Sequence, residues 1–256
     1  IWQLGRHRVM CGDSTVKENV EKLMDGKKGS MIFTSPPYNI NAGMYETYKD
    51  NLESREYIDF NIKIFDLWTK FMDGIIFWNI SYNKNSKTEF IDILYEINKK
   101  VDKIKFLDLV VWDKGHGMPI NQKDAMTRSY EDIFVFNNEE EFYKDNELIA
   151  VFKNKVGAYY RKKKNKGLTN YWKIQTNDTQ LDNHKACYPV MLVVKGILIG
   201  SDENDIILEP FAGSGTNIIA CEKTNRICYG MELDPKYVDV IIKRWEDYTN
   251  NKAIKL

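Results

Sequence analysis

Short apolar runs rich in β-branched and aromatic residues recur along the sequence, and stretches with the apolar spacing of helices lie between most of them. Runs of this composition predict strands. An alternation of strands and helices is typical of an α/β fold, in which helices pack on the faces of a sheet. The predicted strands span residues 8–11, 31–33, 75–78, 106–112, 133–136, 206–208 and 227–229.

The helical stretches carry recognisable start signals. In each, a residue that can cap a helix precedes an apolar stripe, which predicts a helix face packed on the core rather than a cofactor site. Two signals have the spacing of a capping box, and another combines a cap with a first-turn proline. The signals are Thr15 with Glu18, Ser86 with Glu89, Ser54, and Asp234 with Pro235.

Length and composition restrict the class of protein. With 256 residues, 43% of them apolar, the chain can bury one large core, or one core with an appended lobe. No apolar run approaches the roughly 18 residues that span a membrane, and no signal-like block follows Ile1, so we expect a cytoplasmic protein without a membrane segment. The four cysteines lack C-x-x-C spacing and few histidines accompany them, which predicts buried thiols and no metal site.

Charge is balanced overall but unevenly distributed. The 37 basic and 37 acidic residues cancel, so net charge alone indicates no polyanionic partner. Residues 153–173, however, contain eight lysines and arginines and no acid, mixed with aromatic residues, which suits phosphate contact and base stacking. A solvated loop beside the acidic run 139–141 is the alternative. The candidate contacts are Lys155, Arg161, Lys162, Lys163, Lys164 and Lys166, with Tyr159, Tyr160, Tyr171 and Trp172 as stacking residues.

The region around this basic run also differs in organisation. Residues 138–182 break the alternation of strand and helix and are rich in polar side chains, and no internal repeat is present. We interpret them as a lobe inserted into a single catalytic domain of residues 1–256. Target recognition is expected in that lobe.

A glycine-rich turn follows one predicted strand, in the sequence "DIILEPFAGSGTNIIACEKT" of residues 205–224. Its glycines allow the backbone to approach a ligand, and the helix that follows offers free N–H groups to an anion. The turn lacks the G-K-[ST] of a Walker loop, and Ile218 replaces the third glycine of a dinucleotide fold. Roughly twenty residues on, Glu232 ends the next strand, where a carboxylate suits a ribose diol. S-adenosylmethionine fits these features; a structural turn with an ordinary surface glutamate is the alternative.

The other informative segment is "FTSPPYNIN", residues 33–41, directly after a buried strand. Proline cannot continue a β-ladder, so Pro36 and Pro37 predict a stiff loop that leaves the sheet. The loop also carries a hydroxyl at Ser35 and an aromatic ring at Tyr38. A purely structural proline turn is the alternative.

Together, "TSPPY" and "EPFAGSGT" resemble the amino-methyltransferases of DNA, which methylate the exocyclic nitrogen of cytosine or adenine. The resemblance implies a Rossmann-like methyltransferase fold that depends on S-adenosylmethionine, with a mainly parallel seven-stranded sheet and helices on both faces. The catalytic motif precedes the donor motif, which is similar to the circularly permuted β-class order. Methyltransferases of protein glutamine have a similar loop but the opposite order.

The resemblance also implies roles for individual residues. "HRVMCGDS" resembles the strand whose aspartate lies near the donor's adenine, and "HKACYP", residues 184–189, is similar to a segment ahead of the donor loop. In that segment Pro189 is placed to start a helix that is capped by Gly200. "VVWDK" and "SYEDIFVF" resemble segments beside the target base, although Tyr130-Glu131 replaces the usual His-Glu pair. The implied catalytic residues are Ser35, Pro36, Pro37 and Tyr38, and the implied cofactor contacts are Asp13, Thr34, His184, Ala186, Pro189, Glu209, Pro210, Phe211, Gly213, Ser214, Gly215, Thr216 and Glu232.

The implied mechanism starts from a poor nucleophile, because the lone pair of the amino group is delocalised into the base. Ser35 and a carbonyl near Pro36 are placed to accept its two N–H bonds and to aim the lone pair at the donor methyl. Tyr38 would stack on a base flipped out of the duplex. Serine at the first loop position favours cytosine N4, and adenine N6 is the alternative. Attack at cytosine C5 is disfavoured because the chain has no Pro-Cys dipeptide.

The resemblance further implies double-stranded DNA as the partner, contacted by the basic residues of the run described above. A homodimer and a companion restriction endonuclease are additional expectations. A DNA-binding relative without activity is the alternative from another class. The complete donor motif argues against it.

Overall fold

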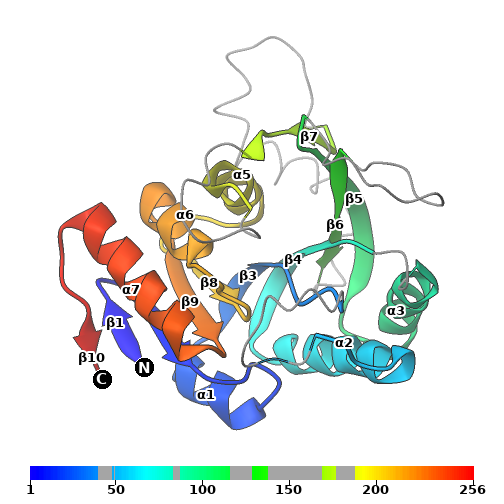
Figure 1. Ribbon diagram of the computed structural model, residues 1–256, viewed down its shortest axis with the longest axis horizontal. Coiled ribbons are helices and arrows are strands. Elements are labelled where there is room, and N and C mark those ends of the chain that lie inside the picture. Colours follow the sequence, from blue (N-terminus) through cyan, green and yellow to red (C-terminus); the bar gives the residue numbers. More distant parts are fainter. Residues whose placement is uncertain (40–47, 49, 83–86, 116–128, 138–168, 177–187) are drawn as a thin grey trace.

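The structure, a computed structural model, describes residues 1–39, 48, 50–82, 87–115, 129–137, 169–176 and 188–256. Its strands are β1 (Trp2–Leu4), β2 (His7–Cys11), β3 (Gly29–Thr34), β4 (Met72–Ile80), β5 (Lys105–Asp113), β6 (Tyr130–Asn137), β7 (Tyr171–Lys173), β8 (Ile206–Glu209), β9 (Ile227–Glu232) and β10 (Ile254–Lys255). They form one sheet in the order β10-β1-β2-β9-β8-β3-β4-β6-β5-β7 (Figure 1). From β2 to β4 all neighbours are parallel, whereas β6 is antiparallel to both of its neighbours.

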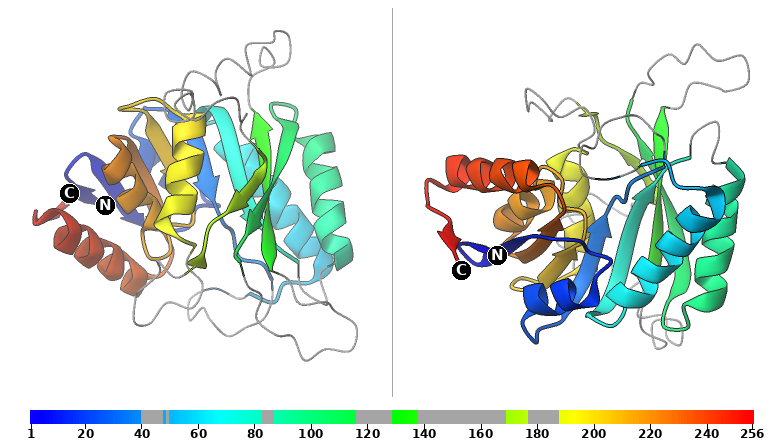
Figure 2. Two further views of the ribbon diagram at one scale, coloured as in Figure 1. Left: turned by 90° about the horizontal axis from the view of Figure 1, so that it is seen from above. Right: turned by 60° about the horizontal axis from the view of Figure 1, so that its bottom comes forward.

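Helices cover both faces of this sheet (Figures 1 and 2). Those that the structure describes are α1 (Lys17–Met24), α2 (Ser54–Trp68), α3 (Lys87–Lys100), α5 (Val190–Gly200), α6 (Thr216–Thr224) and α7 (Pro235–Thr249). The buried residues of α1, α2 and α3 form one core, and those of α5, α6 and α7 form the other. The predicted α/β class, with helices on both faces of a largely parallel sheet, is confirmed.

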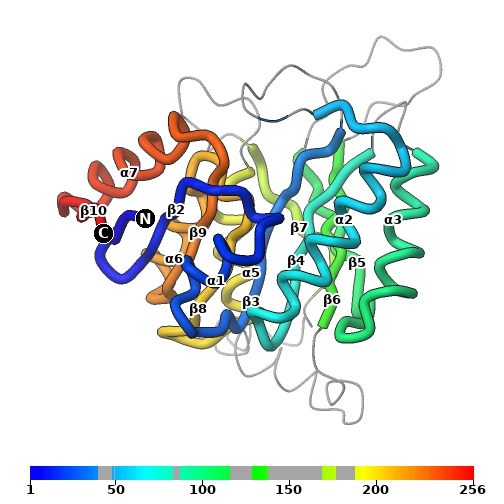
Figure 3. The backbone as a smooth tube through the Cα atoms, turned by 90° about the horizontal axis from the view of Figure 1, so that it is seen from below, coloured from blue at the N-terminus to red at the C-terminus, as the bar shows by residue number. Residues whose placement is uncertain are grey.

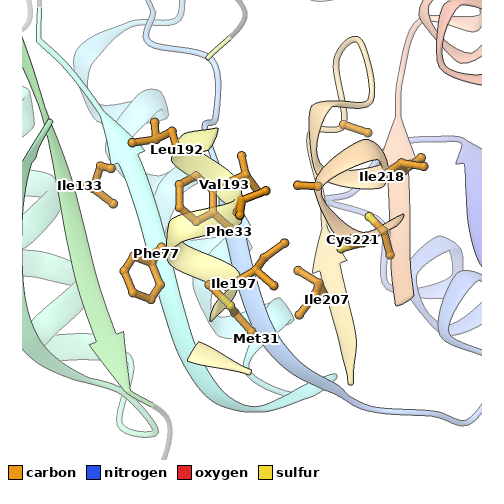
Figure 4. Packing of buried hydrophobic residues seen from close by; sticks show 14 of the residues in the cluster. Met31, Phe33, Phe77, Ile133, Leu192, Val193, Ile197, Ile207, Ile218 and Cys221 are labelled. Atoms are coloured by element: carbon orange, nitrogen blue, oxygen red, sulfur yellow. The ribbon is translucent and has the colours of Figure 1, made fainter. Parts of the chain in front are cut away.

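Strand β3 contributes to both cores. Met31 and Phe33 pack against Val193 and Ile197 of α5 (Figure 4), whereas Ile32 faces the core of α1 and α2. The side chains of Met31, Ile32 and Phe33 are all fully buried. A parallel strand covered on both faces has no polar side, which explains its continuous apolar sequence.

Helix α5 packs closely on β3 and β4 through two glycines. A Cβ on Gly196 would come within 2.5 Å of Phe33 Cε2, and one on Gly200 within 2.6 Å of Ile75 Cγ2. The predicted start is confirmed, because Pro189 is the N-cap. The predicted cap at Gly200 is wrong, because this residue is still helical. Its glycine is explained by close packing instead.

Other helix starts agree with the sequence less uniformly. Asp234 caps α7 as predicted, and its carboxylate accepts a 2.9 Å hydrogen bond from the first turn. Helix α1 follows Val16, which makes no side-chain cap bond, rather than the predicted Thr15. Glu53 caps α2 in a capping box, one residue before the predicted position. The path of the preceding loop decides which side chain reaches the first-turn N–H groups. Ser86 lies outside the described residues.

The seven predicted strands are all present, as β2 to β6, β8 and β9, but the sheet is wider than seven strands. Within the described residues, β1, β7 and β10 extend its two edges. Each of these has only two or three residues, too few to show a periodic pattern. Residues 171–173, assigned to the inserted lobe, belong to the sheet. Trp172 is buried against Phe77, with ring centroids 6.0 Å apart, and is not exposed for base stacking.

The order of strands in space differs from their order along the chain, as the colours in Figure 3 show. Strands β8 and β3 are parallel neighbours. From β8 the sheet continues to β9 and β2, and from β3 it continues in the opposite direction to β4. In open α/β sheets, ligands bind outside the carboxyl ends of strands at such a reversal.

Strand β3, which leads into the predicted catalytic loop, precedes β8 along the chain. That order is the one predicted for a permuted chain, and the permutation itself stays a prediction. The terminal strands β1 and β10 pair, and Leu256 N donates to Ile1 O at 3.0 Å. Among the described residues, no helix combines the length and apolarity required to cross a membrane.

Candidate active site

Two buried polar residues meet at the carboxyl ends of β3 and β8. The Thr34 hydroxyl donates a 2.5 Å hydrogen bond to Glu209 Oε1, and the two residues are 0% and 1% exposed. The chain leaves the sheet after each of them, into residues 35–38, the Pro-Pro loop, and residues 210–215, the glycine loop. The two loops identified in the sequence therefore begin side by side.

Glu209 is fully enclosed by hydrogen-bonding groups. Phe211 N donates to Oε1 at 2.9 Å, and Tyr188 Oη lies 3.1 Å from Oε2. The same Oη lies 2.8 Å from Asn217 Oδ1, whose amide is oriented by donation from Nδ2 to Phe33 O at 2.6 Å. Tyr188 has one hydroxyl proton but two neighbouring acceptors, Glu209 Oε2 and Asn217 Oδ1. Both contacts are hydrogen bonds when Tyr188 donates to Asn217 and a protonated Glu209 donates to Tyr188. Burial raises the pKa of Glu209 to about 8, in agreement with a neutral carboxyl group.

Glu232, at the end of β9, binds the glycine loop. Its Oε2 accepts from Gly213 N at 2.8 Å, and its Oε1 accepts from Asp234 N at 2.9 Å. Burial raises the pKa of Glu232. Gly12 N donates to the Glu232 carbonyl at 2.9 Å, which places Asp13, the next residue, beside it. Three neighbouring strand ends thus bring the predicted adenine, ribose and glycine-loop contacts to one edge of the sheet.

Arg244 on α7 holds the glycine loop from behind. Its Nη1 lies 3.1 Å from Ser214 O, 3.3 Å from Ser214 Oγ and 3.1 Å from Thr216 Oγ1. Both hydroxyls therefore face the helix, so a ligand contact at Ser214 or Thr216 would go through the backbone. Gly215 has a φ of +80°, and a Cβ there would come within 3.0 Å of Ile241. Only glycine fits this turn without strain.

The Pro-Pro loop is anchored to β4 and α2. Ser35 Oγ lies 2.8 Å from Tyr38 Oη, which in turn lies 3.1 Å from Asn79 Oδ1. Tyr57 Oη donates to the Pro37 carbonyl at 2.9 Å. The loop is thus tied down by side chains as well as stiffened by its prolines. Tyr38, predicted to stack on the target base, uses its hydroxyl to bind the protein.

Asn39 directly follows the Pro-Pro loop and has a φ of +56°, a left-handed conformation that asparagine tolerates. Its N–H donates to Asp50 Oδ1 at 2.8 Å. Its side chain exchanges two hydrogen bonds with the Leu52 backbone, at 2.8 and 2.7 Å. These contacts hold the residue after Tyr38 against the start of α2.

The remaining predicted site residues divide into two groups. Pro36 and Pro210 are buried, and the Phe211 ring lies 5.5 Å from the Trp68 ring, so Phe211 supports the loop as part of the core. The second group lies outside the described residues and consists of His184, Ala186, Lys155, Arg161, Lys162, Lys163, Lys164 and Lys166.

Among the described residues, no group of three or more histidine, cysteine, aspartate or glutamate side chains could hold a metal ion.

Four contributors to the site were not identified in the sequence: Tyr188, Asn217, Asn79 and Arg244. Asn79 had a usable signal, because it is a polar residue inside the apolar strand run of β4. Asn217 also follows a recognised motif directly. Tyr188 stands in the recognised segment "HKACYP", residues 184–189, which was its signal. Arg244 has no local signal, since its contacts come from a distant helix.

A family model described as DNA methylase, for N6 and N4 methyltransferases, matches residues 30–244. This range includes all of β3 except Gly29, both loops and most of α7. The chain belongs to the N6/N4 DNA methylase family. The predicted family is therefore confirmed, and the matched residues contain both the Pro-Pro loop and the glycine loop.

Several curated relatives are Type II methyltransferases. M.Cfr9I of Citrobacter freundii is 32% identical over 142 residues, which cover 56% of this chain and 45% of the relative. M.BglII of Bacillus subtilis is 25% identical over 266 residues, which cover 92% of this chain and 72% of the relative. The match to M.Cfr9I thus spans less than half of that protein.

Solved structures show the same fold. The PvuII DNA methyltransferase, described as cytosine-N4-specific, has a TM-score of 0.72 at 19% identity and covers 96% of this chain and 88% of its own. The M1.HpyAVI–SAM complex has a TM-score of 0.60 at 20% identity, with 93% and 98% covered. At these identities the likeness concerns the fold, and it confirms the predicted methyltransferase architecture.

Proposed function

We propose that this protein transfers a methyl group from S-adenosylmethionine to the exocyclic amino group of a DNA base. The observation that carries the proposal is the Thr34–Glu209 hydrogen bond, which holds the start of the Pro-Pro loop against the start of the glycine loop. A donor bound at the second loop would face a base bound at the first. Membership of the DNA methylase family supports the same reaction.

The residues at the glycine loop fit the donor. A Cβ on Gly213 would meet no atom within 4 Å, so the loop is open on that side. Each oxygen of Glu232 accepts one backbone N–H, and a carboxylate oxygen can accept a further bond from a ribose hydroxyl. Ile218 N already donates to Gly215 O at 3.1 Å, so the N–H groups before it, at the start of α6, are the ones that suit the donor's carboxylate. S-adenosylmethionine supplies the electrophilic methyl group.

The Pro-Pro loop fits an amino group. Ser35 is half-buried at the loop's start, and the Pro36 carbonyl follows it on a backbone stiffened by two prolines. Two acceptors on adjacent residues can bind the two N–H bonds of a base amino group and hold its nitrogen near tetrahedral geometry. Because the acceptors are in place before reaction, little reorganisation is needed as charge develops on the nitrogen.

Cytosine N4 is the target we favour, and adenine N6 is the second candidate. Ser35 is a neutral acceptor and weaker than the carboxylate that other family members place there, which suits a target amino group that needs less activation. The PvuII enzyme, whose fold this chain shares, is described as cytosine-N4-specific. Double-stranded DNA is the proposed partner, and the basic residues 155–166 are its proposed contacts. A homodimer and a companion endonuclease are also proposed.

The test is methyl transfer to DNA from a host without methylation. Purified protein, labelled donor and this DNA should give incorporation that Ser35→Ala abolishes while donor affinity is kept. Nuclease digestion and mass spectrometry then identify the product as N4-methylcytosine or N6-methyladenine, and modified-base sequencing locates the site. A folded protein that binds the donor but labels no DNA would contradict the proposal.

A further inference from the structure

We propose that Asn79, through Tyr38, fixes the direction of the Ser35 hydroxyl, so that Ser35 Oγ meets the target base only as a hydrogen-bond acceptor. Asn79 is then a positioning residue that selects an amino group over a carbonyl group. The inference rests on the proposed function and deepens it. It follows from counting the protons along one chain of side chains.

The first step is the orientation of the Asn79 amide. Asn79 lies near the end of β4 and is 1% exposed. Its Nδ2 lies 3.2 Å from Glu131 Oε2 and 3.1 Å from the Asp132 carbonyl. The other oxygen of Glu131 pairs with Lys114 Nζ at 2.9 Å, so the carboxylate acts as an acceptor at both oxygens. The NH₂ group therefore faces β6, and Oδ1 faces Tyr38.

The second step is the Tyr38 proton. Tyr38 Oη lies 3.1 Å from Asn79 Oδ1 and 3.3 Å from the Asn79 carbonyl. Neither oxygen can donate, so the phenol's one proton is directed to Asn79. The opposite arrangement would place lone pairs against each other beside Asn79, whose own side chain is buried.

The third step is Ser35. Its Oγ lies 2.8 Å from Tyr38 Oη, and either atom could donate in isolation. Because the Tyr38 proton is already directed to Asn79, Ser35 donates and Tyr38 accepts. The lone pairs of Ser35 Oγ are then left for the base. A neutral serine is thereby given the acceptor-only character that a carboxylate has at the same position.

This polarity matters for the chemistry. An amino group brings N–H donors to Ser35 Oγ, whereas a carbonyl oxygen would meet lone pairs with no proton between them. A freely rotating hydroxyl could also donate to the amino nitrogen and occupy the lone pair needed for methyl transfer. The hydrogen-bonded series Lys114–Glu131–Asn79–Tyr38–Ser35 prevents both the binding of a carbonyl group and donation from Ser35 to the amino nitrogen. It also gives a role to Glu131, the glutamate of the Tyr130-Glu131 pair, which orients Asn79.

The experiment compares duplexes that carry the target base or its carbonyl counterpart, uracil for cytosine or hypoxanthine for adenine, at the mapped site. Each is placed opposite an abasic position, so that base pairing does not contribute to binding. Wild type should bind the amino duplex about tenfold more tightly, the difference expected for one unmade hydrogen bond. Tyr38→Phe keeps the ring but removes Oη, so the ratio should fall towards one and kcat should drop about tenfold with unchanged donor affinity.

Asn79→Ala should lower the ratio of the two duplex affinities and should lower kcat, as Tyr38→Phe does. Adding Asn79→Ala to Tyr38→Phe should have little further effect, because both substitutions act through the Ser35 proton. The matched control is Asn137→Ala, an equally buried asparagine at the opposite end of the β4–β6 pair. It should lower stability without changing the ratio. An unchanged ratio in Tyr38→Phe, or an equal change in Asn137→Ala, would overturn the inference while wild-type methylation upholds the proposed function. Absence of methylation by wild type would overturn both.

Discussion

Thr34 Oγ1 and Glu209 Oε1 lie 2.5 Å apart although 175 positions separate them in the sequence. Both side chains are closed to solvent, so this contact is made in a region of low dielectric. It connects the last residues of two adjacent parallel strands, and each strand continues into one of the functional loops. The parallel pairing of β3 with β8 brings the two loops together, and this buried hydrogen bond joins the residues from which they start.

Thr34→Val keeps the shape of the side chain but removes the hydroxyl donor. We expect the free energy of unfolding to fall by about 1–3 kcal/mol, because Glu209 Oε1 loses a buried partner. Donor affinity should weaken as well, since Glu209 also receives Phe211 N from the glycine loop. Urea denaturation and calorimetric titration with the donor measure the two effects. Thr34→Ser retains the hydroxyl and should stay close to wild type on both; a loss of the same size would contradict this role of the hydroxyl.

Glu209 should make stability depend on pH. Burial raises its pKa from 4.5 to about 8, so between these values the folded protein holds a proton that the unfolded chain has released. The free energy of unfolding should therefore fall as pH rises through this window, by about 1.4 kcal/mol per pH unit from this group alone.

Glu209→Gln tests that pH dependence, because glutamine resembles the protonated acid and does not titrate. The variant should fold like wild type at pH 5 and should lose the downward slope between pH 5 and 8. Denaturation midpoints across this range provide the comparison. Parallel pH profiles for variant and wild type would show that Glu209 is ionised in the folded protein.

Gly215→Ala should be costly for two reasons. Its φ of +80° disfavours any side chain by about 1–2 kcal/mol, and the new Cβ would lie within 3.0 Å of Ile241. Gly26→Ala is the control, because Gly26 has a φ of +72° but a Cβ there would meet no atom within 4 Å. Gly215→Ala should lose more stability than Gly26→Ala. Only Gly215→Ala should also lose affinity for the methyl donor. Equal effects would mean that the contact with Ile241 is unimportant.

Arg244→Met should weaken donor binding with little effect on DNA affinity, because the guanidinium holds the glycine loop through Ser214 and Thr216. A loss of about tenfold corresponds to the hydrogen bonds of one charged donor. Lys243→Met is the matched control, since its side chain is 77% exposed and pairs with Asp247 on the outer side of the same helix. Titration with the donor separates the two variants. Similar losses in both would assign the effect to net charge.

Local sequence patterns predicted most of the fold. The seven longer strands were predicted correctly from their apolar runs, and the start of α7 from Asp234 followed by Pro235. Both signals are local, because they depend on neighbouring residues only. The short edge strands β1, β7 and β10 were missed, since each is defined by its partner strand rather than by its own residues. The role of Gly200 was interpreted wrongly for a similar reason, as its neighbour is Ile75 on another element.

The two loops, their motif residues and the family followed from the amino-acid sequence, because these depend on residue type and spacing within a few positions. The folded arrangement was needed to show that Thr34 meets Glu209, that Arg244 contacts the glycine loop, and that Asn79 Oδ1 lies beside Tyr38 Oη. Such contacts join strands and helices that are distant along the chain. Their geometry is set by strand order and helix packing, which no local pattern encodes.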